Sequence, residues 1–194
     1  MRLVLGSGSP RRTELLSRLG LEFDVVPPEV DETRLPDESP GDYVGRVARA
    51  KAHDVADSDS VVVAADTAIV HESRILGKPA HPEEARSMLR RLQGDTHEVF
   101  TGVAVALAAS VEVVVDVTEV RLMPMTNDEI ADYVDGGEPM GKAGAYALQG
   151  RGGVYVESVT GSPFTVIGLP IHLLPRLMHR VGADIDQFRS RSNL

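Results

Sequence analysis

The sequence contains no cysteine and no tryptophan, and only 4% of its 194 residues are aromatic. Without cysteine, the protein has no disulfide, no thiolate zinc site and no cysteine nucleophile. The scarcity of aromatic residues predicts a core of aliphatic side chains, chiefly Val, Leu and Ala. The H-E-x-x-H and G-x-S-x-G motifs are also missing, which argues against zinc peptidase and serine-triad chemistry.

Excess positive charge and long apolar runs are absent as well. The formal net charge of −9 argues against general nucleic-acid binding, which depends on accumulated Lys and Arg. A small phosphorylated ligand stays open, because it needs only a local group of cations. The longest apolar runs, Val61–Ala65 and Val103–Ala109, are too short to cross a bilayer, and no segment resembles a signal peptide. We therefore expect a cytoplasmic protein with no stable nucleic-acid partner and no membrane association.

Hydrophobic periodicity and capping residues predict a mixture of strands and helices. Strands are expected at 3–5, 22–26, 61–65, 69–70, 75–76, 97–107, 111–122 and 154–159, and helices at 10–19, 42–56, 82–92, 126–134 and 166–181. The last helix should bend near Pro170 and Pro175, and the polar tail 186–194 should be frayed. Because strands and helices do not alternate strictly, the pattern favours an α/β fold with a mixed sheet, in one domain covering residues 1–194.

The segment Ser7–Arg12 joins the first predicted strand to the first helix. Ser9 suits the N-cap and Pro10 the first helical position. Such a helix start presents free backbone N–H groups and a positive dipole end, and the forked guanidinium groups of Arg11 and Arg12 suit phosphate oxygens. The alternative is an ordinary capped helix with solvated arginines.

Two acidic positions are candidates for metal binding or for activating water. The strand Val61–Ala65 is expected to end at Asp66-Thr67, where α/β proteins keep their ligands, so Asp66 suits a metal ligand or a general base. Asp66 could instead cap a turn. Glu32 lies in the proline-flanked acidic loop Pro27–Pro40. Alone it would be a solvated turn residue, but beside a phosphate site it could help hold Mg²⁺.

Two lysines and one glutamine complete the candidate set. Lys51 on the helix 42–56 and Lys78 after the strand 75–76 gain interest only from their neighbours, because most lysines are solvated. The segment Gly141–Gly150 is rich in Gly and Ala, which permits close backbone approach to a ligand, and the amide of Gln149 could read a base edge. A tight packing loop would need small residues too.

Taken together, these segments resemble the Maf family of nucleotide pyrophosphatases from about residue 3 to residue 178. The matching segments, in order, are 5–16, 30–32, 51–52, 65–67, 76–79, 101–103, 141–150 and 166–170. The resemblance implies a mixed, elongated sheet flanked by helices, with two lobes around a central cleft, similar to inosine triphosphate pyrophosphatases. It also implies a homodimer.

The resemblance further implies hydrolysis of a nucleoside triphosphate between its α and β phosphates with a divalent cation, Mg²⁺ or Mn²⁺. By position, the resemblance implies that Asp66 is the proton acceptor and that Glu32 and Asp66 bind the metal. It implies phosphate binding by Ser7, Arg12, Lys51 and Lys78. Substrate choice is implied for Arg11, Thr67 and Gln149.

The segment Lys142–Gly150 looks like the branch of the family that acts on dTTP and UTP, a house-cleaning activity. Gly6 stands where Ala is common and Ala147 where Gly is common, and these departures bear on substrate range. Two alternatives stay open. One is a regulator of septum formation that binds nucleotide or nucleic acid without essential catalysis. The other is the same chemistry on a modified purine triphosphate.

Overall fold

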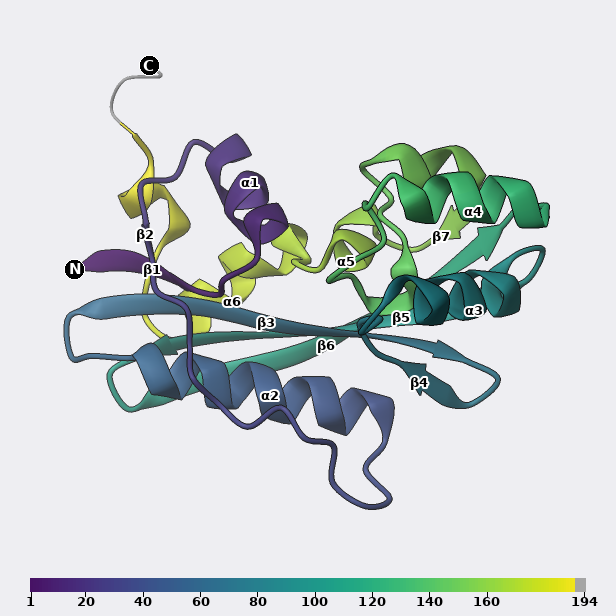
Figure 1. Ribbon diagram of the computed structural model, residues 1–194. Coiled ribbons are helices and arrows are strands. Elements are labelled where there is room, and N and C mark those ends of the chain that lie inside the picture. Colours follow the sequence, from purple (N-terminus) through teal and green to yellow (C-terminus); the bar gives the residue numbers. More distant parts are fainter. Residues whose placement is uncertain (191–194) are drawn as a thin grey trace. The chain divides into compact units, whose positions relative to one another are not determined.

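The computed structural model describes residues 1–190, and the chain divides into two compact units. Unit 1 comprises residues 1–66, 101–116 and 168 onward, and unit 2 comprises residues 67–100 and 117–167. Three strands contribute residues to both units: β3 (Ser60–His71), β5 (Thr96–Leu107) and β6 (Ser110–Leu122). Figure 1 labels these elements along the chain.

The strands form one mixed sheet in the order β2-β1-β3-β5-β6-β7, with β4 paired to β3. Strand β1 (Arg2–Gly6) lies parallel to β2 (Asp24–Val25) and to β3. Strand β4 (Arg74–Leu76) is antiparallel to β3, and β7 (Val156–Thr160) is antiparallel to β6. The predicted mixed α/β fold is confirmed, although β2 is shorter than the predicted strand.

In unit 1, helix α2 (Pro40–Val55) covers one face of the strands, and α1 (Pro10–Arg18) and α6 (Leu174–Arg180) lie on the other (Figure 1). Alternate strand residues face α2, and small helix residues let it approach closely. A Cβ at Gly102 on β5 would lie 2.6 Å from the carbonyl carbon of Val44 on α2. The core on this side comprises Val4, Ala48, Ala52, Val62, Ala64, Ala104 and Ala106.

Strand β3 corrects one prediction about Asp66. Residues 60–66 are all buried, as expected for a strand covered on both faces. The strand does not end at Asp66-Thr67, however, but continues to His71, because residues 69–71 pair with β4. The charge of Asp66 is tolerated inside the strand because the ammonium of Lys51 lies 2.8 Å from it.

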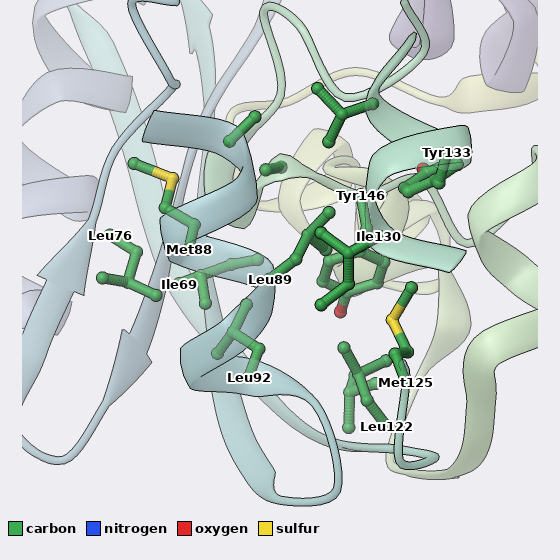
Figure 2. Close-up of a cluster of buried hydrophobic side chains, with 14 of the residues drawn as sticks. Ile69, Leu76, Met88, Leu89, Leu92, Leu122, Met125, Ile130, Tyr133 and Tyr146 are labelled. Carbon is green, nitrogen blue, oxygen red and sulfur yellow. The ribbon is translucent and has the colours of Figure 1, made fainter. Parts of the chain in front are cut away.

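In unit 2, α3 (Pro82–Leu92) and α4 (Asn127–Asp135) pack on an aliphatic core. Thr126 and Glu129 form the capping box that begins α4. Figure 2 shows the core side chains of this unit, with the Tyr146 ring among them. The buried members are Ile69, Leu76, Ala85, Met88, Leu89, Leu92, Val99, Val120, Leu122, Met125, Ile130, Tyr133, Val134, Ala145 and Tyr146.

Two predicted elements near the C-terminus differ from the structure. The helix expected over residues 166–181 is three pieces: α5 (Pro163–Ile167), the 3-10 turn Ile171–Leu173 and α6. The break falls at residues 168–170, where Gly168 has a φ of 111° and Pro170 cannot continue a helix. The strand expected from residue 154 begins at Val156, because a 3-10 turn occupies Arg151–Tyr155.

The segment expected to be a frayed tail is ordered up to residue 190. Residues Ile185–Phe188 form a 3-10 turn, and the Glu22 amide donates to the carbonyl of Phe188 at 2.7 Å. The Ser190 amide donates to the carbonyl of Gly20 at 2.9 Å. The remaining residues of the tail, 191–194, lie outside the described part of the chain. Within residues 1–190, no helix is both long enough and apolar enough to cross a membrane.

Candidate active site

The loop between β1 and α1 organises the first part of the site around a buried arginine. The Ser7 hydroxyl accepts hydrogen bonds from the Ser9 amide at 3.2 Å and from a terminal nitrogen of Arg12 at 3.0 Å. The Nε of Arg12 donates to the carbonyl of Gly168 at 2.7 Å. Ser9 and Pro10 occupy the predicted N-cap and first helical positions, although the Ser9 side chain makes no capping bond. Arg12 is therefore held inside unit 1 rather than solvated.

The electrostatic environment of Arg12 favours an anionic ligand. Burial lowers the pKa of Arg12 to about 10, with Asp66 and Glu32 opposing the shift and the positive charge of Arg11 adding to it. The pKa of Arg11 is also lowered by burial. Both guanidinium groups remain charged at neutral pH, but their desolvation is incompletely offset by the protein. A phosphate group placed beside them would compensate that cost.

A lysine between two carboxylates forms the second part of the site. The Nζ of Lys51 on α2 lies 2.8 Å from Oδ1 of Asp66 on β3 and 2.6 Å from Oε1 of Glu32 in the loop that precedes α2. The side chains of Lys51 and Asp66 are 7% and 10% exposed, whereas that of Glu32 is 43% exposed. Two carboxylates thus share one ammonium, and the outer carboxylate faces solvent.

An arginine that the sequence analysis did not single out holds the Glu32 loop on α2. Arg46 donates to Oε1 and Oε2 of Glu38 at 2.6 and 2.9 Å and to the carbonyl of Thr33 at 3.0 Å. The hydrogen bond from Arg46 is the main cause that lowers the pKa of Glu38 to about 2. Because Thr33 directly follows Glu32, these bonds fix the backbone that presents Glu32 to Lys51. No spacing rule in the sequence links Arg46 to Glu38.

The predicted site residues divide between the two units. Unit 1 contains Ser7, Arg11, Arg12, Glu32, Lys51 and Asp66, which the contacts and electrostatic effects above bring together. Unit 2 contains the other three. Thr67 is half-buried and follows Asp66 on β3, Lys78 is exposed between β4 and α3, and Gln149 is exposed in the glycine-rich segment.

Unit 2 also contains a buried histidine and tyrosine pair. The Nε2 of His97 lies 2.8 Å from the Tyr146 hydroxyl, and the two rings pack edge to face. Burial lowers the pKa of His97 to about 4, so its imidazole is neutral at pH 7. This pair fixes Tyr146, three residues before Gln149, in the core of the unit (Figure 2).

Comparisons with known proteins identify relatives of this chain. The family described as "Maf-like protein" matches residues 2–181. A protein of Anaeromyxobacter dehalogenans named dTTP/UTP pyrophosphatase is 52% identical over 186 residues, covering 93% of this chain and 94% of that protein. A Bacillus cereus protein of the same name is 43% identical, covering 95% and 97%. Among solved structures, the Ham1 protein of Staphylococcus aureus aligns with a TM-score of 0.46 and 13% identity over 94% of each chain.

Proposed function

The chain belongs to the Maf family, and from that premise we propose that it hydrolyses dTTP and UTP between the α and β phosphates. It is a nucleoside triphosphate pyrophosphatase, a hydrolase acting on acid anhydrides, and its products are the nucleoside monophosphate and pyrophosphate. The observation that carries the proposal is the contact of the buried Lys51 with Asp66 and Glu32, in the same unit as the buried Arg12.

The cations of the site account for substrate binding and for leaving-group stabilisation. Ser7, Arg12 and Lys51 can donate to phosphate oxygens, and Lys78 of unit 2 is a further proposed phosphate ligand. As the bridging P–O bond breaks, its electron pair goes to the departing pyrophosphate, and negative charge gathers on oxygen. Positioned ammonium and guanidinium groups stabilise that charge more than they stabilise the bound substrate.

Asp66 is the proposed general base. The oxygen of water forms the new bond to phosphorus, and the proton it releases passes to the Asp66 carboxylate. The Oδ1 atom of Asp66 is held at 2.8 Å by Lys51, which fixes the orientation of the carboxylate within β3. Arg11, Thr67 and Gln149 are the proposed determinants of substrate choice, and the amide of Gln149 offers both a donor and an acceptor to a base edge.

A divalent cation, Mg²⁺ or Mn²⁺, is part of the proposal, and Glu32 and Asp66 are the residues that would hold it. Within residues 1–190 there is no group of three His, Cys, Asp or Glu side chains that could hold a metal. Two carboxylates suit Mg²⁺, which commonly binds one or two protein carboxylates and completes its shell with substrate phosphates and water. When bound, the ion supplies charge neutralisation at the phosphate oxygens.

The test is incubation of purified protein with dTTP or UTP and Mg²⁺ or Mn²⁺, with chromatographic separation of both products. The proposal expects monophosphate and pyrophosphate in equal amounts, loss of turnover with a chelator, and loss of turnover in Asp66→Asn. Asp135→Asn is the matched control, since Asp135 is an exposed carboxylate on α4 that pairs with Arg86. Absence of turnover with both nucleotides would refute the proposal.

The alternatives that the sequence left open are less favoured, because the relatives quoted above are named for hydrolysis of dTTP and UTP. A purely binding regulator of septum formation predicts a cellular effect that survives Asp66→Asn. A preference for a modified purine predicts faster turnover of ITP or 7-methyl-GTP than of dTTP. We also propose a cytoplasmic location and a homodimer, to be tested by cell fractionation and by sedimentation of the purified protein.

A further inference from the structure

In unit 2, the glycine-rich segment that carries Gln149 folds around a hydrogen-bonded centre formed by the Glu138 carboxylate and the Tyr133 hydroxyl. The carboxylate of Glu138 accepts hydrogen bonds from the Arg151 amide at 2.8 Å and from the Gly152 amide at 3.2 Å. It also accepts one from the Tyr133 hydroxyl at 3.0 Å. That hydroxyl in turn accepts a hydrogen bond from the Ala147 amide at 3.2 Å. These bonds hold the backbone on both sides of Gln149.

The glycines of the segment show how closely it surrounds this centre. A Cβ at Gly150 would lie 2.6 Å from the carboxyl carbon of Glu138, so a side chain at that position would displace the carboxylate. A Cβ at Gly152 would meet the Tyr133 hydroxyl and would lie 3.0 Å from the Ala147 amide nitrogen. The hydrogen-bonded centre therefore requires glycine at these two positions, whether or not a ligand also approaches the backbone there.

The charge of Glu138 is needed for this arrangement. Burial by itself would raise the pKa of Glu138, but the hydrogen bonds from the Arg151 and Gly152 amides and from Tyr133, together with the charge of Lys142, outweigh burial and lower it. The ammonium of Lys142 also donates to the backbone carbonyl of Glu138. A carboxylate offers two acceptor oxygens, whereas an amide offers one and turns a donor toward the other partner.

Gln149 occupies the exposed part of the segment between two anchored sides. Before it, Ala145, Tyr146 and Ala147 are buried, with Tyr146 in the core of unit 2 (Figure 2). After it, the Glu138 carboxylate holds residues 151 and 152. A glutamine amide can rotate to present its donor and acceptor in either order, so base selection requires a backbone that limits where the amide lies.

We propose that Glu138, with Tyr133, is a positioning residue for base selection: it fixes the backbone around Gln149 so that the amide discriminates between bases of the nucleotide substrate. This inference rests on the proposed function, in which Gln149 contacts the base. Glu138 acts through the backbone at residues 147–152, so its loss should change which nucleotide is used more than it changes the rate at saturation.

The experiment compares kcat and KM for dTTP and GTP in the full-length wild type, Glu138→Gln, Tyr133→Phe and Gln149→Ala. Glu157→Gln is the matched control, because Glu157 is an exposed carboxylate of the same unit that pairs with Arg121 on the surface. Amide hydrogen exchange of residues 145–153 is measured on every variant. It reports the state of the segment independently of activity.

The proposal expects Glu138→Gln to lower the dTTP to GTP ratio of kcat/KM by about tenfold or more, the effect of losing a hydrogen bond to a charged acceptor. The change should come mainly from the KM for dTTP, with kcat altered less than about threefold. Exchange at residues 151 and 152 should be faster. Tyr133→Phe should give a smaller change in the same direction, with faster exchange at Ala147, and Glu157→Gln should match the wild type.

Three results overturn the proposal, and they are distinguishable. If Glu138→Gln accelerates exchange but leaves the dTTP to GTP ratio within about twofold of wild type, positioning by Glu138 is wrong and the proposed function stands. If Gln149→Ala leaves the ratio unchanged, Gln149 does not select the base, and Glu138 has nothing to position. If wild type hydrolyses no triphosphate, the proposed function itself fails. If Glu138→Gln does not fold, Tyr133→Phe takes its place. Faster exchange with an unchanged dTTP to GTP ratio in Tyr133→Phe then refutes the proposal, and faster exchange with a lower ratio supports it.

Discussion

Removal of the Lys51 ammonium is the perturbation with the clearest structural consequence. In Lys51→Met, Asp66 loses the ammonium that lies 2.8 Å from it, although its side chain is only 10% exposed. It keeps Glu32 as a negatively charged neighbour, and the buried Arg12 is the positive charge that remains. Breaking a buried ion pair by deleting one partner costs about 3–5 kcal/mol. We expect the free energy of unfolding to fall by that amount.

The reverse deletion should be milder. In Asp66→Asn, the Lys51 ammonium keeps its contact of 2.6 Å with Glu32, whose side chain is 43% exposed, so no charge is left without a partner. A loss of about 1–2 kcal/mol is expected, the value for one hydrogen bond. The double variant removes both charges of the buried pair and should lose less than the sum of the two single losses, with a coupling of about 2 kcal/mol.

Urea denaturation at pH 7, followed by circular dichroism, measures all three losses, and dTTP turnover is measured on the same samples. Turnover in Asp66→Asn should fall about 100- to 10,000-fold, the range for removal of a general base. A loss below about 1 kcal/mol in Lys51→Met, or strict additivity in the double variant, would show that the buried contact does not organise the site.

Three further predictions concern residues that support the two units. Gly102→Ala should lower stability by about 1–3 kcal/mol, because its Cβ would lie 2.6 Å from the Val44 carbonyl carbon and push α2 from the sheet. An unchanged urea midpoint would contradict this packing. In the folded protein His97 has a pKa of about 4, whereas in the unfolded chain its pKa has the ordinary value of about 6.5. Between pH 6.5 and 4 the unfolded chain therefore binds a proton that the folded protein does not, and the free energy of unfolding should fall by about 3 kcal/mol. His97→Phe should lack this part of the pH dependence in urea titrations at pH 7 and 4.5. Arg46→Gln frees the Glu38 end of the loop that carries Glu32, the proposed metal ligand, and should raise the Mg²⁺ concentration for half-maximal turnover about tenfold. An unchanged Mg²⁺ titration would show that the anchor is dispensable.

Much of the secondary structure could be predicted because its signals are local. Ser9 and Pro10 start α1, Thr126 and Glu129 cap α4, and the continuous apolar run at 61–65 marks a strand covered on both faces. Each of these signals needs only residues within one turn or one strand. The elements that were predicted wrongly differ mainly in where they end. Strand β3 runs through Asp66 into the segment that pairs with β4, and the helix expected at 166–181 breaks at Gly168, whose φ is 111°.

In the candidate site, local information ends where long-range contacts begin. The sequence alone supplies the residue types of the site, the candidate phosphate-binding loop at residues 7–12 and the absence of thiol chemistry, because these depend on composition and on short motifs. Only the tertiary structure decides that Lys51 lies between Asp66 and Glu32 and that Arg12 is bound to the carbonyl of Gly168, 156 residues away. The hydrogen bonds from Arg46 to Glu38, and those that Glu138 accepts around Gln149, likewise follow no spacing rule. Such contacts form because packing brings distant groups together and because a buried charge must find a partner.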